Sequence, residues 1–370
     1  MKIQFLNPFI TGDDIKEVVK AIKSGWLTYS NFSKRFENDF SKYLGVKETV
    51  VNSSGTAALH VSLLAAGVGP GDEVITTPLS YVATSNAILY VGAKPVFVDV
   101  EPDTGLMDVS RVEKAITKKT KAIIPIHIYG QMADMKRLKR IADKYKLLIV
   151  EDACHAIESK RDGIRPGQKS FSACFSFHVA KNITSGEGGA VATNSGLGEK
   201  IRLLCEGGVV RTGDRKTGAY TRHMEFLGYK YSLASFQAAL LLGQLKRVER
   251  QWKVRRRLWK YYADNLKKID GVSFPKEVPN SKHAYNMFVI WVNQGKRNEL
   301  RRKLEDVGVQ TSVHFNPIHL EPYYRKSFGF KPGDFPVAEK LGFSTITLPL
   351  YPSLTKKEQD YIIEKIKKII

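Results

Sequence analysis

Short apolar runs alternate with amphipathic stretches over residues 48–153. The apolar runs have strand length, and they are 48–52, 73–77, 95–100, 121–130 and 147–153. Strands that are apolar along their whole length and alternate with helices predict a parallel sheet with helices on both faces. Ligands of such sheets bind beyond the carboxyl ends of the strands. The residues that directly follow each run are therefore where we look for chemistry.

The segments on either side of this region have other patterns. Residues 11–25 predict a helix that Thr11 caps, and residues 31–45 predict a second helix with phenylalanines at helical spacing. Residues 170–179 and 189–194 predict two further strands of the sheet. Residues 232–269 predict two helices or one long bent helix.

A smaller unit is predicted from about residue 271 onward. Residues 271–275, 287–293 and 309–315 are strand-like, whereas 297–308 and 355–370 have helical spacing. The length of 370 residues also exceeds that of one small domain. We therefore expect a large α/β domain over residues 1–250 and a smaller C-terminal α+β domain over residues 251–370.

Composition narrows the class of protein. No apolar run reaches the roughly 18 residues that a membrane span needs, and polar residues interrupt the N-terminus, so we expect a cytoplasmic protein without a membrane partner. Three cysteines without a C-x-x-C motif argue against a disulfide scaffold and a zinc site. The net charge of +21 would attract nucleic acid, but the lysines are scattered over most predicted helices. We therefore expect no nucleic-acid partner and no metal.

Two segments that follow strands carry candidate chemistry. In SSGTAAL, Ser54, Gly55 and Thr56 lie where a strand gives way to a helix, and the free amides of such a helix start can bind phosphate. Taken alone, the segment is more typical of an ordinary helix cap. In VEDACHA, Asp152 follows a very apolar strand, where it could hold a protonated pyridine nitrogen or serve as a cap. His155 could face the same ring or belong to the core.

Lys181 has the most unusual setting among the lysines. It lies between the strand-like FSF and the glycine-rich TSGEGG, and so it does not belong to a solvated helix face. A lysine that forms a Schiff base must lose its proton, and burial favours that loss. Ser176, five residues earlier, could donate its hydroxyl to a phosphate.

These segments occur in an order that resembles one known family. The matching blocks are 24–28, 52–60, 69–104, 124–135, 150–156, 172–189 and 228–245, which together extend over nearly the whole chain. The chain resembles the DegT-type (StrS-like) sugar aminotransferases, which depend on pyridoxal 5′-phosphate (PLP). The resemblance implies the α/β fold of fold-type-I PLP transferases, with a large, mostly parallel sheet domain and a smaller C-terminal α+β domain.

The resemblance also implies roles for individual residues. Lys181 would form the Schiff base and move the substrate proton, and Asp152 would pair with the pyridinium nitrogen. Tyr81 would stack on the cofactor ring and contact the substrate, and His155 would lie near the phenolic oxygen of the ring. The residues implied to hold the cofactor phosphate are Ser54, Gly55, Thr56 and Ser176.

A partner subunit and a substrate segment are implied in the same way. Family members work as homodimers, and Lys230, where many relatives have Asn, would reach the phosphate in the neighbouring subunit. Residues 311–324 resemble the substrate-facing segment, in which His314, His319 and Tyr323 could contact the substrate. Arg211 and Arg215, on a predicted loop, could grip a pyrophosphate or simply be solvated.

The expected activity is therefore transfer of an amino group from L-glutamate to a nucleotide-linked keto-sugar, with PLP and its pyridoxamine form (PMP) as the cofactor states. The segment 311–324 looks closest to enzymes that aminate C4 of 4-keto-6-deoxy sugars. One alternative is a PLP-dependent sugar dehydratase, although relatives with that chemistry carry His where Lys181 stands. The other alternative is a regulatory protein that keeps the fold without catalysis.

Overall fold

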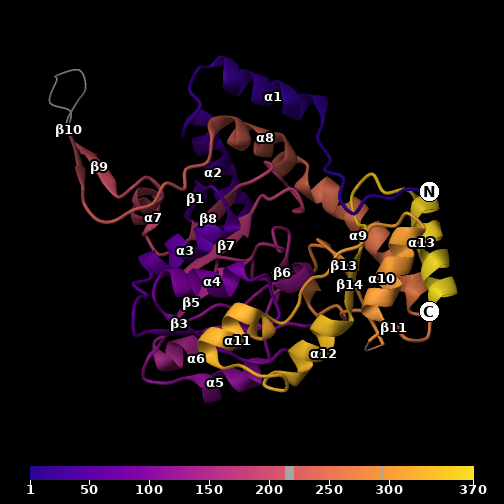
Figure 1. The fold of residues 1–370 in the computed structure, drawn as a ribbon. Helices are drawn as coiled ribbons and strands as arrows, with labels where there is room; N and C mark the ends of the chain where they lie inside the picture. The colour runs from indigo at the N-terminus through magenta and orange to yellow at the C-terminus, as the bar shows by residue number, and fades with distance from the viewer. Residues whose placement is uncertain (213–220, 294) are drawn as a thin grey trace.

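A seven-stranded sheet forms the centre of the large part of the molecule (Figure 1). The computed structural model describes residues 1–212, 221–293 and 295–370. The strands follow one another across the sheet in the order β1 (Glu48–Asn52), β8 (Gly189–Thr193), β7 (Ser172–Ser176), β5 (Leu148–Asp152), β4 (Thr120–Ile123), β2 (Glu73–Thr76) and β3 (Lys94–Phe97). β8 is antiparallel to both of its neighbours, whereas the pairs from β7 to β3 are parallel. The predicted fold class, a large and mostly parallel sheet, is confirmed.

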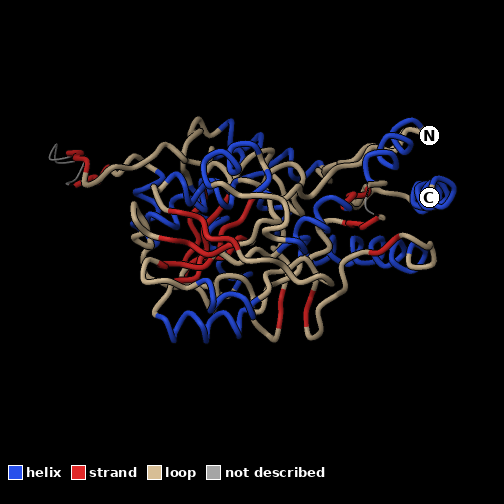
Figure 2. Tube along the Cα trace, turned by 60° about the horizontal axis from the view of Figure 1, so that its bottom comes forward, coloured by secondary structure: helices blue, strands red, loops and turns tan. Residues whose placement is uncertain are grey.

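Helices cover both faces of this sheet, as Figure 2 shows. Neighbouring residues of one strand point to opposite faces: Val74 packs in one core with α3 (Gly55–Ala65) and α4 (Ala83–Tyr90), and Ile75 packs in another core beside α6 (Met135–Tyr145). α7 (Gly198–Cys205) joins the first face, and α2 (Asn31–Leu44) and α8 (Ser235–Lys246) cover the β1–β8–β7 part of the second. The short helix α5 (Val112–Ala115) lies on the second face as well. Both faces of the strands are therefore dry, which explains their unbroken apolar sequences.

The C-terminal part has its own antiparallel sheet, in the order β11 (Val272–Ser273), β13 (Phe288–Val292) and β14 (Thr345–Leu348). Its core contains side chains of α9 (Val248–Leu266), α10 (Arg297–Asp306) and α13 (Lys356–Ile369), and it also takes in Ile3 from the chain start. The helix α12 (Pro336–Ser344) packs in a core that β13 shares with residues following β2 and β4, whereas α11 (Pro322–Phe328) packs against Phe97 of β3. The domain boundary at residue 250 stays a prediction, and that position falls within α9.

One predicted strand of this smaller sheet is wrong. Residues 309–315 form only single bridges, from Val309 to Ile3 and from Ser312 to Thr347, and the third strand is β14 instead. Beyond Ser312 the chain leaves the sheet, because His314 and Phe315 turn into the cavity described below. By contrast, residues 232–269 form two helices, one of the two predicted alternatives, with Arg247 between them.

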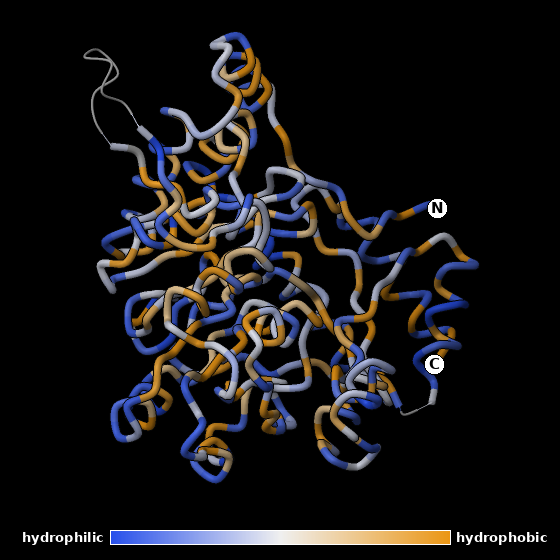
Figure 3. Tube along the Cα trace, turned by 60° about the vertical axis from the view of Figure 1, so that its left-hand side comes forward, coloured by the Kyte–Doolittle hydropathy of each residue, from blue (hydrophilic) through white to orange (hydrophobic). Residues whose placement is uncertain are grey.

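Two small two-stranded sheets complete the described structure. β6 (Lys160–Arg161) pairs with β12 (Ser281–Lys282), and β9 (Val209–Thr212) pairs with β10 (Thr221–Met224). The β9–β10 pair projects from the body of the molecule in Figure 1. Hydrophilic segments recur along the whole chain in Figure 3, in agreement with the scattered lysines. Within the described ranges, no helix combines the length and the apolar character needed to cross a bilayer.

The N-terminal helix α1 (Gly12–Lys23) is fastened to the α8–α9 junction by a buried ion pair. Thr11 caps α1, as the sequence predicts, and the structure adds a capping box between Thr11 and Asp14. The Asp14 carboxylate is fully buried, and both of its oxygens accept hydrogen bonds from the Arg247 guanidinium. A bidentate pair of this kind fixes orientation as well as distance.

The Asp14→Ala substitution should lower the free energy of unfolding by about 3 kcal/mol, because it leaves the Arg247 cation largely buried without a partner. Urea denaturation measures the change. Asp13→Ala is the matched control, since Asp13 is exposed and pairs only with Lys16 one turn away; its loss should stay below about 1 kcal/mol. Equal effects of the two substitutions would contradict this role of Asp14.

Candidate active site

A cavity of about 370 Å³ opens at the carboxyl ends of the parallel strands. Its walls come from the segments that follow β1, β2, β5 and β7, and from the segment that precedes α11. The predicted site residues that line it are Ser54, Gly55, Thr56, Tyr81, Asp152, His155, Ser176, Lys181 and His314. Its size lies within the range of small-molecule sites.

Asp152 is held rigidly at the end of β5. Its Oδ2 accepts a hydrogen bond of 2.7 Å from the Thr84 hydroxyl, and its Oδ1 accepts one of 3.2 Å from the Cys154 amide. Thr84 in turn lies 3.0 Å from the Ser80 hydroxyl. These donors stabilise a carboxylate without neutralising it. Sequence reasoning missed Thr84, although its place shortly after the end of β2 could have indicated it.

Lys181 reaches the same cavity from the segment after β7. Its surroundings lower the pKa of the amine, because burial disfavours the ammonium form; the nearby Cys154 and Asp152 oppose that shift without cancelling it. No carboxylate of the described residues lies within ion-pair distance of its Nζ. The residue therefore combines an easily deprotonated amine with a free approach to the cavity.

The start of α3 offers a cradle for an anion. Ser54 is the N-cap of this helix, and its hydroxyl accepts a hydrogen bond of 3.1 Å from the Ala57 amide. A Cβ atom at Gly55 would lie 2.8 Å from Cys154 Sγ and 2.9 Å from Ser176 Cβ, so only glycine fits there. The cap and the anion site are compatible, because the Ser54 hydroxyl keeps its own proton as a donor and the first amides of a helix have no carbonyl partner within the helix.

Aromatic rings line another part of the cavity. The Phe315 ring lies 5.9 Å from the His155 ring, nearly parallel to it, and 6.2 Å from the ring of Tyr81. The Tyr81 side chain is 61% exposed and so can receive a flat ligand. Sequence reasoning missed Phe315, because a phenylalanine in a predicted strand gives no sign of facing a ligand.

Two of the histidines that line the cavity, His155 and His314, are neutral. Burial lowers the pKa of His155 far below its ordinary value, and the nearby Lys181 lowers it further. Burial, and then Lys181, likewise lower the pKa of His314 to about 3. His314 Nδ1 also lies 2.8 Å from the Thr347 hydroxyl. Both rings therefore act as neutral hydrogen-bonding groups at pH 7.

Three predicted site residues lie elsewhere. His319 is wrong as a substrate contact: its ring is fully buried, and its Nε2 bonds to Glu339 at 3.0 Å. Tyr323 is 60% exposed on α11 and does not line the cavity. Lys230 lines a different cavity, together with Trp26 and Arg202, on the side of the molecule that carries β9.

The predicted contacts of Arg211 and Arg215 with a pyrophosphate stay predictions, because Arg215 and the side chain of Arg211 lie outside the described residues. All three cysteines are free, and within the described ranges no cluster of three His, Cys, Asp or Glu residues could hold a metal ion.

The cavity residues fit pyridoxal phosphate. An amine with a lowered pKa, a hydrogen-bonded carboxylate, a helix start with hydroxyls and an exposed aromatic ring face one space. These are the groups that an aldehyde, a pyridine nitrogen, a phosphate and a flat ring require.

Comparison with known proteins points to the same chemistry. Residues 8–367 match the DegT/DnrJ/EryC1/StrS aminotransferase family. The chain is 32% identical to the GDP-perosamine synthase of Caulobacter vibrioides, covering 100% of this chain and 98% of that one. It is 33% identical to the UDP-4-amino-4-deoxy-L-arabinose–oxoglutarate aminotransferase of Shewanella sediminis, covering 98% and 97%. The PMP form of Spr1654 from Streptococcus pneumoniae, named as a sugar aminotransferase, superposes with a TM-score of 0.95 at 31% identity, covering 100% and 99%.

The neutral state of His314 predicts a pH dependence of stability. Between pH 6.5 and 5 the unfolded chain protonates this histidine and the folded chain does not, so the free energy of unfolding should fall as pH falls. The loss attributable to His314 is up to about 1.4 kcal/mol per pH unit. Urea denaturation of wild type and His314→Gln over this range measures it, and the variant should have the shallower slope. His223→Gln, at an exposed site, is the control, and parallel slopes for wild type and His314→Gln would contradict the prediction.

Proposed function

Since the chain belongs to the DegT/DnrJ/EryC1/StrS aminotransferase family and is a PLP-dependent sugar aminotransferase, we propose that it transfers an amino group from L-glutamate to a nucleotide-linked keto-sugar. The proposed acceptor is a 4-keto-6-deoxy sugar, and the product is a nucleotide-linked amino sugar. The observation that carries the proposal is that Lys181 and Asp152 face one cavity that also contains an anion cradle.

The names of two relatives support the finer parts of this proposal. One relative is named for a GDP-linked sugar, and the other for a UDP-linked 4-amino sugar. The second name also contains oxoglutarate, which is the keto acid that L-glutamate becomes when it gives up its amino group. Glutamate and a nucleotide-linked sugar are therefore the donor and acceptor classes to test first.

Lys181 is the proposed catalytic base and acid. When bound, pyridoxal phosphate supplies an aldehyde that an amine can attack and a ring that accepts electrons. The lowered pKa of Lys181 favours the neutral amine needed for such an attack and for moving the proton at the amino-bearing carbon of the substrate. The Asp152 carboxylate, fixed by Thr84, would keep a proton on the ring nitrogen.

The remaining residues have proposed binding roles. Ser54, Gly55, Thr56 and Ser176 would hold the phosphate at the start of α3. Tyr81 would cover the ring face and contact the sugar. His155 would lie near the phenolic oxygen and His314 near the sugar, both as neutral hydrogen-bonding partners.

The Lys181→Ala variant should lose glutamate-driven conversion of the bound cofactor to PMP by at least about 10²-fold, because it removes the nucleophile and the proton carrier. The loss is measured by the visible absorbance of the cofactor and by release of 2-oxoglutarate. Borohydride reduction of the loaded wild type should attach the cofactor to Lys181, as read by peptide mass. Lys267→Ala, at an exposed site, is the control and should retain the wild-type rate.

Other outcomes would decide between the alternatives. A wild type that binds PLP but is not converted by glutamate would favour the sugar dehydratase. A wild type without cofactor absorbance would favour a regulatory role. If conversion occurs, a panel of nucleotide-linked 3-keto and 4-keto sugars, with products read by mass, identifies the acceptor.

We propose further that two copies of the chain share their active sites. Large apolar side chains lie exposed on and next to α1, and they adjoin α8: Ile15, Val19, Ile22, Trp26, Leu27 and Phe236. Contiguous exposed apolar surface favours a protein partner. Lys230 is exposed and lies outside the cavity of its own subunit, as a residue that serves the neighbouring site would. A cytoplasmic location stays a prediction.

Mixed dimers test this sharing. Lys181→Ala and Lys230→Ala homodimers should both be weak. If Lys230 serves the neighbouring site, each mixed dimer contains one site with both lysines intact. Unfolding and refolding an equal mixture should therefore restore roughly a quarter of the sites, by the statistics of a symmetric dimer. Glutamate-driven conversion measures the recovery, and no recovery above the two separate variants would contradict the proposal.

A further inference from the structure

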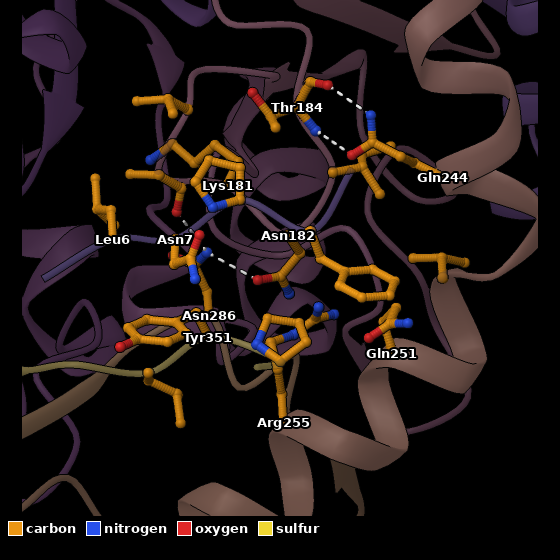
Figure 4. Close-up of a pocket in the computed structure, with 18 of the residues that line it drawn as sticks. Leu6, Asn7, Lys181, Asn182, Thr184, Gln244, Gln251, Arg255, Asn286 and Tyr351 are labelled. Atoms are coloured by element: carbon orange, nitrogen blue, oxygen red, sulfur yellow. Dashed lines mark hydrogen bonds between the residues drawn. The ribbon is translucent and has the colours of Figure 1, made fainter. Parts of the chain in front are cut away.

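The side-chain amide of Asn182, the residue after Lys181, makes three hydrogen bonds behind the cavity. Its Nδ2 donates to Glu158 Oε2 at 2.7 Å and to the Ala284 carbonyl at 3.0 Å. Its Oδ1 accepts a bond of 3.0 Å from Asn286 Nδ2. Figure 4 shows the Asn182 side chain below Lys181 and hydrogen-bonded to Asn286, with the Arg255 side chain lower in the view. Both donor hydrogens of this amide and one of the two acceptor positions of its oxygen are therefore used.

The Glu158 carboxylate that receives Asn182 belongs to a buried ion pair. Glu158 is fully buried, and its other oxygen bonds to the guanidinium of Arg255, which is 2% exposed. Burial raises the pKa of Glu158, while Arg255 and Asn182 oppose that rise. A charge pair without access to water needs each of its hydrogen bonds. Asn182 is therefore tied to a rigid anchor and not to a mobile surface group.

This anchor joins four separate parts of the chain. Glu158 follows β5, Arg255 lies on α9, and Ala284 and Asn286 lead into β13 of the smaller sheet. Two residues beyond Asn182, the backbone amide and carbonyl of Thr184 bond to the Gln244 side chain of α8 at 3.0 and 2.7 Å. The backbone just after Lys181 is thus fixed from both sheets, as Figure 4 shows in part.

We propose that Asn182 is a positioning residue that aims the Lys181 amine into the cavity. The inference rests on the proposed function of Lys181 and extends it to the network that holds this lysine. Asn182 is not among the residues that line the active-site cavity, so it would act through the backbone that it shares with Lys181. Reacting groups lose about 10²-fold in rate when they are misplaced by about 1 Å, so this constraint matters for chemistry.

Two substitutions of Asn182 test the proposal. Asn182→Ala removes all three bonds, and Asn182→Asp keeps the shape but loses both donors and places a second acid beside Glu158. Gln251→Ala is the matched control. Gln251 lines a second, smaller pocket behind Lys181, which Asn182 and Arg255 also line, and its Oε1 bonds to no described residue. Asn286→Ala removes only one bond to Asn182, and it serves if the other variants fail to fold.

Three quantities are measured for each variant: the melting temperature without cofactor, the pH midpoint of the cofactor absorbance, and the kcat and KM of the glutamate half-reaction. Both Asn182 variants should shift the pH midpoint and lower kcat by about 10- to 100-fold, with KM within about twofold of wild type. Gln251→Ala should resemble wild type in the pH midpoint and in kcat, and Asn286→Ala should be intermediate.

The alternative is that Asn182 has a purely structural role. If the Asn182 variants lower the melting temperature but match Gln251→Ala in pH midpoint and kcat, the proposal is overturned. Failure of the proposed function is distinguishable, because wild type itself would then show no conversion by glutamate. The pH midpoint would still report the position of Lys181 in that case, since it requires only bound cofactor.

Discussion

The site depends on keeping an amine and a carboxylate in one cavity without letting them form an ion pair. A lysine in contact with an aspartate would stay protonated, and its amine could not attack a carbonyl group. Here the Asp152 oxygens are occupied by Thr84 and Cys154, and Lys181 lies where burial works against its charge. We propose that the space left between the two groups receives the pyridine ring of the cofactor.

The architecture supplies this arrangement through strand direction. β5 and β7 are parallel neighbours, so Asp152 and Ser176 end at the same edge of the sheet, and the segment that carries Lys181 begins there. β8 returns antiparallel beside β7 and brings its Gly189 next to Asn52 of β1, close to the start of α3. Amine, carboxylate and anion cradle thus come together because β1, β7 and β5 run in the same direction and end at the same edge of the sheet, although the residues are up to 127 positions apart in the sequence.

Much of the large sheet could be predicted, because strands buried on both faces have apolar sequences that stand out from those of helices. Lys181, Asp152 and the segment 54–56 could also be predicted, since each follows such a strand. Predictions failed where tertiary context decides. The strand β14 has only the four residues TITL, which is too short for the spacing of apolar residues to identify it as a strand. Residues 309–315 alternate between apolar and polar as a strand does, but they pair only through single bridges. His319 is indistinguishable from a ligand-binding histidine until its partner Glu339 is known.

The path of the first fourteen residues links the two parts of the molecule. Ile3 packs in the core of the smaller sheet, and Asp14 is bound at the α8–α9 junction beside the larger one. The intervening segment lines the cavity behind Lys181, together with Asn182 and Arg255. A relative movement of the two parts would have to stretch or displace residues 3–14. We therefore expect this N-terminal segment to limit how far the site can open.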